Sequence, residues 1–485
     1  MSYLDLLKLV SPEVIVVVTA LIVLSIGLAT KRTAPFCLVI AALGLLIAIG
    51  SISMLPRSAN LFDGMLVISP LTSLFKVICI VLAFFTVLLT QSEKSPVNYG
   101  EYLAIILLAT IGLMLLVGSE QLLVIFIGLE LLGLSLYVLT AFNKNDIRSA
   151  EAGVKYFLFG STASAFTLFG ISLVYGMSGS TSLATISEKI GSGNVQPLLA
   201  AGIVMTLVGF AFKIAAAPFH LWAPDAYQGA PVPSAAFIAS GSKVASFVVL
   251  GKIVLIGFGP VHGSADWHAL MAGWSPLLAV LAALSILLGN LVALAQTNVR
   301  RLLAYSAVAH GGYTLLGLVA GSHDGFSATL FYTTIYAITL VGAFGVVGVV
   351  RHETGGDDLN DFAGLSRRAP LLAGCMSIFM LSLAGMPPLA GFFGKFYLFS
   401  AALRADANHG LLWLVALALF GSLISLYYYL VVLKVIFVDR GTCDPKLPIA
   451  DRLTQKLTVS ALAVLVLFFG LLPQILAGRI LACFP

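Results

Sequence analysis

Charged side chains are scarce in this chain of 485 residues: Asp, Glu, Lys and Arg make up 10% of it, against about 25% in soluble proteins. Hydrophobic residues make up 60%, and the mean hydropathy is +1.05. This composition excludes an ordinary soluble protein and predicts an integral membrane protein. In a membrane protein, the positions of the positive residues along the chain are more informative than the net charge of +5. No nucleic-acid partner is expected.

Residue patterns for bond chemistry are also missing. The chain has no Gly-rich nucleotide loop after a strand, no nucleophile elbow and no cluster of metal ligands. No C-x-x-C occurs, which excludes an encoded iron–sulfur or zinc site, so we expect neither a cofactor nor a metal in this chain. We expect packing roles for its cysteines, Cys37, Cys79, Cys375, Cys443 and Cys483.

The N-terminal segment lacks the features of a cleavable secretory signal. The first apolar run follows Asp5 without a cationic start, and it ends at Lys31 and Arg32 without a small-residue cleavage site. We therefore expect this run to stay in the protein as the first span.

Long apolar runs dominate what is present. Runs of about 17 to 26 residues are long enough for spanning helices and too long for barrel strands. They predict an all-α polytopic membrane protein of about 14 transmembrane helices. Because the loops are short, we expect a single membrane domain over 1–485, with three leading spans in 1–95 and the last span in 450–485.

Positive charge alternates along these predicted spans. The loops after odd-numbered spans carry Lys31, Arg32, Lys94, Lys144, Arg148, Arg300, Arg301, Arg351, Arg367, Arg368, Arg440, Lys446, Arg452 and Lys456. The loops after even-numbered spans carry Arg57, Lys189 and Arg404, with Lys252 at the end of a span. The positive-inside rule then predicts that both termini face outward.

The seventh predicted span is interrupted between Gly209 and Trp222. Pro218 has no N–H, so the carbonyl of Ile214 loses its helical partner close to Lys213. A lysine at membrane depth is costly, and irregular backbone there is tolerated only where it is buried in protein or lines a wet cavity. Together these features predict an ion path.

A second interrupted span, the twelfth, repeats this pattern. It carries Pro387 and Pro388, with Lys395 about two turns later. Paired broken helices in matching positions are typical of inverted-repeat transporters. We therefore predict two inverted five-helix repeats, spans 4–8 within 96–260 and spans 9–13 within 270–440.

Glu130 lies at the centre of the fifth predicted span. A lone carboxylate at that depth would take up a proton, so keeping it ionised requires a cation, and Lys213 is the natural candidate. The alternative is a static ion pair that holds two helices together.

Further lysines inside the predicted spans favour a transport role. Lys155, Lys243 and Lys395 can pass a proton through water when they are desolvated, which arginine cannot do. Glu151 precedes Lys155 by four residues and could form a plain surface pair with it, although Lys155 lies deeper than such a pair needs. For Lys252 and Lys434 we expect snorkelling to the membrane surface.

His310 lies in the middle of the tenth predicted span. It is either a buried imidazole satisfied by one hydroxyl or a proton relay between the Lys243 and Lys395 segments. Haem ligation is not favoured, because the other histidines lie at span ends or in loops. Asp225, in the turn after span 7, is expected to be a loop and cap residue.

Several of these stretches resemble the antiporter-like membrane subunits of respiratory complex I. They are 128–137 around Glu130, 151–157, 301–310 ending at His310, 385–396 around Lys395, and Phe-Lys213-Ile-Ala-Ala-Ala-Pro218-Phe-His220-Leu-Trp-Ala-Pro-Asp225-Ala-Tyr-Gln-Gly-Ala-Pro231. The amino-acid sequence of residues 151–157 and the lysine at position 395 are most similar to the subunit N family. The resemblance implies a hydrated axis through Glu130, Lys213, Lys243, His310 and Lys395, with Lys155 and Glu151 beside it.

The resemblance also implies partners and a location. NADH, flavin, iron–sulfur clusters and quinone would be bound by other subunits, and a neighbouring antiporter-like subunit would lie beside this one in a bacterial inner membrane. Two alternatives stay open, a subunit of a stand-alone cation/proton antiporter and a structural membrane subunit whose charges only lock helices. A haem-carrying electron-transfer subunit is a more distant alternative.

Overall fold

The computed structural model describes residues 3–29, 34–92, 98–191, 196–405, 408–439 and 453–484. Seven residues that entered the charge and cysteine predictions lie outside these ranges, namely Lys31, Arg32, Lys94, Arg440, Cys443, Lys446 and Arg452.

Helices make up nearly all of the described chain, as predicted. Twelve of them are long and apolar enough to cross a membrane, and two shorter apolar helices, Pro197–Lys213 and Pro370–Ala384, lie where the interrupted spans were predicted. The total of about 14 spans stays a prediction. The strands of the described residues form one short hairpin, in which β1 (Ala59–Leu61) pairs with β2 (Leu66–Ile68) so that Ala59 lies opposite Ile68.

Local sequence sets the ends of the two longest helices. Helix α7 (Ile147–Ser178) begins after Asp146, whose carboxylate accepts from the Arg148 N–H, and ends at Gly179 with a φ of 67°. Helix α15 (His323–Thr354) begins after Ser322 and ends at Gly355 with a φ of 80°. A polar N-cap and a left-handed glycine satisfy backbone groups that a helix leaves free at its ends.

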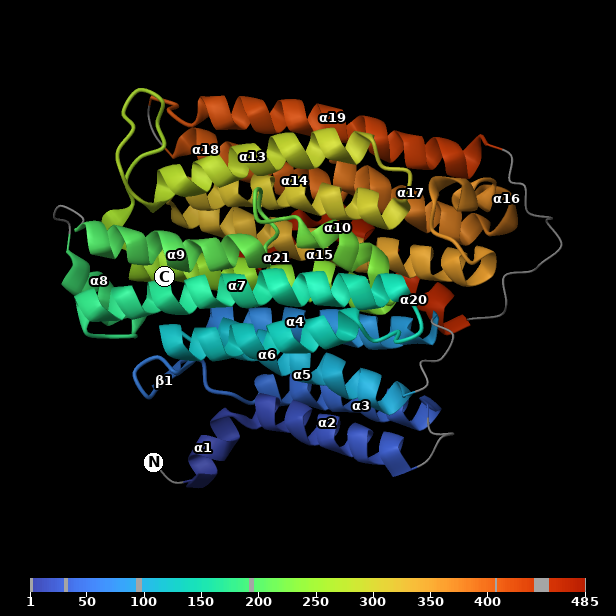
Figure 1. Ribbon diagram of the computed structural model, residues 1–485, viewed down its shortest axis with the longest axis horizontal. Coiled ribbons are helices and arrows are strands. Elements are labelled where there is room, and N and C mark those ends of the chain that lie inside the picture. Colours follow the sequence, from blue (N-terminus) through green and yellow to red (C-terminus); the bar gives the residue numbers. More distant parts are fainter. Residues whose placement is uncertain are drawn as a thin grey trace. The chain divides into compact units, whose positions relative to one another are not determined.

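The described residues form two compact units, Met1–Phe210 with Gly229–Pro260, and Ala211–Gln228 with Val261–Pro485. Unit 1 contains α1 (Tyr3–Leu9), α2 (Ser11–Ala29), α3 (Ala34–Ile52), α4 (Pro70–Leu89), η1 (Thr90–Ser92), α5 (Tyr99–Gly118), α6 (Leu122–Thr140), α7, α8 (Leu183–Ile190), most of α9 (Pro197–Lys213), α11 (Val232–Ala239), α12 (Gly241–Lys252) and η2 (Ile253–Gly257). Its core forms where α5 packs against α2, α3, α4, α6 and α12 (Figure 1).

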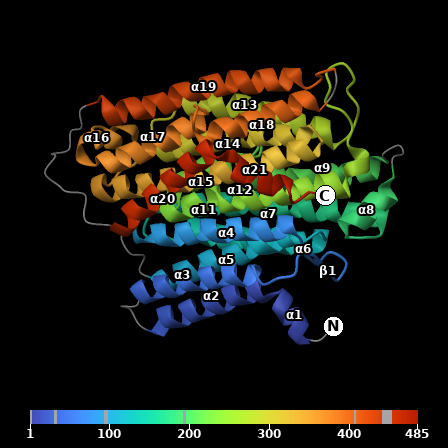
Figure 2. The same ribbon diagram turned by 180° about the vertical axis from the view of Figure 1, so that it is seen from behind.

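Unit 2 is built around α14 and α15, which are buried along almost their whole length. Its elements are most of α10 (Trp222–Gly229), the last residue of η3 (Gly259–Val261), α13 (Trp274–Leu294), α14 (Val299–Val319), α15, η4 (Leu359–Phe362), α16 (Leu365–Arg368), α17 (Pro370–Ala384), α18 (Ala390–Arg404), α19 (Leu412–Phe437), α20 (Leu453–Leu471) and α21 (Pro473–Leu481). Helices α14, α17, α18, α20 and α21 all contact α15 (Figure 2).

The two helix breaks have the same backbone design. After α9, Ala215 takes a left-handed φ of 58°, and the Ala216 N–H reaches back to the Ala211 carbonyl over 2.8 Å. After α17, Gly385 takes a φ of 85°, and the Met386 N–H reaches the Leu381 carbonyl over 3.0 Å. Each break is therefore a helix C-terminus closed by a left-handed residue, followed by an X-Pro bond that is cis in both places.

Helix lengths also match between the two predicted repeats. The segments α5, α6, α7, α9 and 232–257 have 20, 19, 32, 17 and 26 residues. Their counterparts α13, α14, α15, α17 and α19 have 21, 21, 32, 15 and 26 residues. This correspondence supports a repeat, while its inverted orientation stays a prediction.

Candidate functional site

Lys395 lies buried on α18, beside the end of the broken helix α17. Its Nζ donates to the Ala384 carbonyl over 3.0 Å and to Ser422 Oγ over 2.8 Å. In an unbroken helix the Ala384 carbonyl would accept from residue 388, but Pro388 has no N–H. The break therefore supplies the acceptor that holds this ammonium group, as half-helix ends do for cations in transporters.

His310 lies in α14 among tyrosines. Its Nδ1 contacts the Tyr332 hydroxyl, and its Nε2 lies 2.9 Å from the Tyr429 hydroxyl, which also hydrogen-bonds Ser306. The Tyr336 ring lies close by at a tilt, with its centroid 4.9 Å from that of the His310 ring. Both ring nitrogens therefore have hydroxyl partners. The plainer alternative for His310 assumed one hydroxyl partner and the structure shows two, while the proton-relay alternative stays a prediction.

Tyr313 connects the histidine to the lysine. Its ring lies 5.5 Å from the His310 ring, and Lys395 Nζ lies 5.2 Å from the centre of the same tyrosine ring. The Tyr313 hydroxyl accepts from Asn290 Nδ2 over 2.9 Å. The structure thus places His310 and Lys395 around one aromatic residue, within a polar cluster of unit 2.

A small cavity extends this cluster toward the second break. It has a volume of about 10 Å³ and is lined by His310, Tyr332, Tyr336 and Ser382, among others. That volume is near the lower limit for one water molecule. Ser382 lies in the last turn of α17 and accepts from the Gly391 N–H across the break.

The first break lies in unit 2 together with these residues. Lys213 is the last residue of α9 and is buried, at a helix end where the dipole favours a cation. Two residues beyond Ala215, the Ala217 N–H donates to Ser285 Oγ over 2.8 Å. The Ile214 carbonyl, which Pro218 deprives of its helical donor, faces Gly311, the neighbour of His310.

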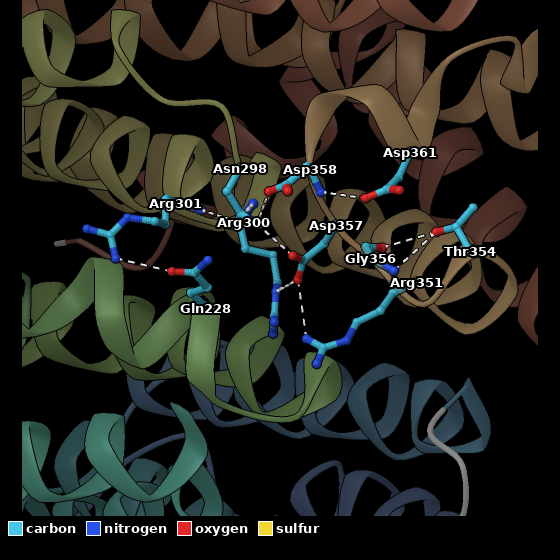
Figure 3. A network of polar contacts seen from close by, with 10 residues as sticks. All are labelled: Gln228, Asn298, Arg300, Arg301, Arg351, Thr354, Gly356, Asp357, Asp358 and Asp361. Atoms are coloured by element: carbon cyan, nitrogen blue, oxygen red, sulfur yellow. Dashed lines mark hydrogen bonds and ion pairs between the residues drawn. The ribbon is translucent and has the colours of Figure 1, made fainter. Parts of the chain in front are cut away.

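Two of the arginines that follow the ninth and eleventh spans, Arg300 and Arg351, share one carboxylate (Figure 3). Arg300 Nε donates to Asp357 Oδ2, and Arg351 Nη1 lies 3.2 Å from the same oxygen. Asn298 Nδ2 donates to the other oxygen of Asp357 over 2.6 Å. This carboxylate therefore ties the start of α14 to the end of α15.

Asp225 is more than a loop and cap residue. It lies in the first turn of α10 and accepts from Arg301 Nη1 over 2.7 Å. Arg301 also donates to Gln228 Oε1 over 3.2 Å, a contact drawn in Figure 3. The segment that follows the first break is thereby anchored to α14.

Glu130 and Lys243 belong to unit 1. Glu130 is half-buried in α6 and accepts from the Ser164 hydroxyl of α7. Lys243 is buried in the first turn of α12, where Ser242 and Ser246 are buried as well. The predicted pairing of Glu130 with Lys213 joins residues of different units and stays a prediction.

Glu151 and Lys155 form an ion pair along α7. Their charged atoms are 2.6 Å apart, and the side chains are 61% and 41% exposed. In the isolated chain this geometry matches the plainer alternative of a surface pair, so a role in transport would need a neighbouring subunit to cover it.

Two buried lysines of unit 1 form ion pairs that had no counterpart in the sequence predictions. Lys76 Nζ lies 2.6 Å from Glu13 Oε1, with both side chains at most 5% exposed. Lys252 Nζ lies 3.3 Å from Glu120 Oε1 and donates to the Val117 carbonyl. The expectation that Lys252 snorkels to the surface is therefore wrong, because its side chain is buried beside the half-buried Glu120. Lys434 is exposed, as expected. The sequence places Glu13 in the first predicted span and Lys76 in the third, and these two opposite charges were the pattern that could have indicated the first pair.

Comparison with known proteins places this arrangement in a family. Residues 119–425 match the family model described as NADH:quinone oxidoreductase/Mrp antiporter, TM. NADH-quinone oxidoreductase subunit N 2 of Acidobacterium capsulatum is 46% identical over 98% of both chains. NADH-quinone oxidoreductase subunit N of Desulforamulus reducens is 40% identical over 90% of this chain and 89% of the relative.

Solved structures show the same fold. A chain of respiratory complex I from Thermus thermophilus with bound aureothin is 32% identical, with a TM-score of 0.79 over 96% of this chain and 98% of that one. A chain of the Mrp complex from Dietzia has a TM-score of 0.84 at 20% identity, over 99% of this chain and 97% of that one. That second likeness concerns the fold alone. On the sequence matches, this multi-pass membrane protein belongs to the NADH-quinone oxidoreductase subunit N family.

Proposed function

We propose that the chain conducts protons across the membrane as a subunit of an NADH:quinone oxidoreductase, driven by quinone reduction in other subunits. The main support is the contact of Lys395 with the carbonyl that Pro388 leaves free. A lysine held by neutral acceptors can both bind and release a proton, which a lysine locked to a carboxylate does less readily.

In this proposal Lys213 takes a proton from the cytoplasmic side while Glu130 stabilises its charged form. Weakening that pair loosens the proton and sends it toward Lys243, His310 and Lys395 for release outside. The hydroxyls around His310 support the later part of the path, because Tyr332, Tyr429 and Ser306 offer it donors and acceptors. Lys155 and Glu151 act at the side of the path where a neighbouring subunit covers them.

In this proposal, the redox groups of the complex are bound by partner subunits. NADH, flavin, iron–sulfur clusters and quinone are bound elsewhere, so this chain carries no redox centre. Its partners include another antiporter-like subunit. It lies in a bacterial inner membrane with both termini on the outer side, as the alternation of positive charge indicates.

Replacing Lys213 by alanine in the assembled complex tests the proposal. Proteoliposomes should lose most NADH-driven proton uptake, and the coupled NADH:quinone activity should fall with it. Lys434→Ala is the matched control, since this lysine is exposed at the end of α19. Normal pumping by a fully assembled Lys213→Ala complex would refute the role of this lysine.

A cation/proton antiporter is a second candidate, because the fold resembles a chain of an Mrp complex. Reconstituting the isolated chain separates the two functions. Sodium-driven proton flux without NADH-linked partners supports the antiporter, whereas flux that needs the assembled complex and NADH supports the proposed function.

A purely structural subunit is the third possibility, and the pairs Lys76–Glu13 and Lys252–Glu120 fit such a role. Glu130→Gln, Lys213→Met and Lys395→Met separate it from transport. If all three variants assemble and pump normally, these charges serve packing alone.

A further inference from the structure

A cavity of about 240 Å³ lies in unit 2, lined by residues of α15, α18 and α21. It involves the first turns of α15, the last turns of α18 and the short helix α21, which packs against α15 (Figure 2). Because the helices begin and end here, the cavity lies at a membrane surface and not at the midplane.

Ser327 contributes a hydroxyl group, without a hydrogen-bond partner in the described part of the chain, to the lining of this cavity. The residue is only 6% exposed, and its hydroxyl has no hydrogen-bond partner among the described residues. Buried hydroxyls are normally hydrogen-bonded. One water would satisfy this hydroxyl but would fill only a small part of the cavity, so a larger polar occupant fits better.

Two opposite charges line the same cavity. Asp324 lies in the first turn of α15, and Arg404 is the last residue of α18. Both are exposed, and neither forms an ion pair within the ranges that the structure describes. The cavity thus offers one cation, one anion and the hydroxyls of Ser327 and Ser400.

The remaining wall is apolar. Phe331 and Tyr397 line the cavity together with Ala401, Ala477 and Leu481. Leu481 is 49% exposed, and Phe396, beside Tyr397, is 55% exposed. A polar end with both charges next to an apolar, lipid-accessible wall suits an amphiphile whose headgroup carries both signs.

We propose that this cavity binds a phosphatidylethanolamine molecule of the surrounding bilayer. The phosphodiester lies on Arg404 with the Ser327 hydroxyl donating to it, because a guanidinium is well suited to phosphate. The ethanolamine ammonium lies against Asp324, and the acyl chains start over Phe331 and Tyr397. Phosphatidylglycerol binds less well because it has no cation for Asp324. This site is independent of the proposed proton path.

Photo-crosslinking in the assembled complex tests the proposal. Complexes are reconstituted with phosphatidylethanolamine or phosphatidylglycerol that carries a diazirine near the top of one acyl chain, and crosslinks to peptides 324–331 and 397–404 are counted by mass spectrometry. The wild type should capture phosphatidylethanolamine several-fold more than phosphatidylglycerol. Arg404→Gln should lower the capture of both lipids, whereas Asp324→Asn should bring their ratio close to one.

Arg479→Gln is the matched control, because this arginine lies exposed on α21 but does not line the cavity. Retained NADH:quinone activity shows that each variant is assembled. Three outcomes overturn the proposal: no capture in the wild type, capture unchanged in both cavity variants, or an equal loss in Arg479→Gln. Full displacement of the lipid by soluble glycerophosphoethanolamine would also overturn it, by making a free phosphodiester the ligand.

Discussion

At the scale of single residues, the partners of three buried lysines distinguish two kinds of site. Lys76 and Lys252 lie against carboxylates, which stabilise a permanent charge. Lys395 lies against a carbonyl, a hydroxyl and an aromatic ring, none of which carries a formal charge. A proton that must leave is held more loosely in the second setting.

Lys395→Arg therefore tests proton release apart from charge. Arginine keeps the positive charge but does not give up its proton, so pumping should fall on the order of tenfold or more, as far as in Lys395→Met. Proton uptake by proteoliposomes measures the effect, with Lys434→Arg as the control. Pumping near the wild-type level in Lys395→Arg would mean that only the charge is needed.

The Tyr429 hydroxyl bridges His310 and Ser306. Tyr429→Phe leaves two buried polar groups short of a partner and should destabilise the protein by about 1–3 kcal/mol. Proton uptake should fall more than stability alone explains. Tyr175→Phe is the control, because this tyrosine lies exposed on α7 in unit 1. Thermal unfolding and proton uptake are measured together; an equal loss of uptake in both variants would contradict a relay through Tyr429.

At the scale of elements, the two breaks were the most predictable part of the chain. Proline lacks an N–H, so Pro218 and Pro388 each predict a freed carbonyl near a lysine. The left-handed residue that ends each helix was not predictable, because Ala215 has no sequence signature for a positive φ, unlike Gly385. The partners of Lys395 were also hidden, since Ser422 lies on a helix far along the chain.

Pro388→Ala tests whether the freed carbonyl matters. The new N–H can compete for the Ala384 carbonyl, so Lys395 loses an acceptor and pumping should decrease several-fold. Pro370→Ala is the control, because Pro370 is the first residue of α17, where a missing N–H costs little. Proton uptake normalised to NADH oxidation measures the effect. If both variants pump alike, the contact between the lysine and the broken helix is incidental.

At the scale of the whole molecule, composition correctly predicted a membrane protein of long apolar helices, whereas the partners of the loop arginines were not predicted. The sequence prediction used only the number of arginines in the loops after spans 9 and 11, which indicates that these loops lie on the inner side of the membrane. In the structure Arg300 and Arg351 share Asp357, so these residues also hold helix ends together. Such pairing depends on which loops meet, and loop sequences do not encode that directly.

Asp357→Asn should therefore destabilise the protein far more than an average surface substitution. It leaves the buried Arg300 without its counter-ion, and breaking such a pair costs about 3–5 kcal/mol. Thermal unfolding of the purified complex and its yield measure the loss. Glu188→Gln, which removes an exposed carboxylate from α8, should change neither. A stable Asp357→Asn complex would show that the cluster contributes little.

The orientation of the entire chain gives the last prediction. Lys144 lies exposed between α6 and α7 and Arg148 is exposed in the first turn of α7, whereas Arg57 is exposed between α3 and α4. Because positive loops stay inside, alkaline phosphatase fused near Arg57 should be active outside the cell, and the same enzyme fused near Lys144 should be inactive. Each span reverses the direction of the chain, so one missed or extra helix between Arg57 and Lys144 would make the two fusions agree. Equal activity would therefore revise both the span order and the direction assigned to proton flow.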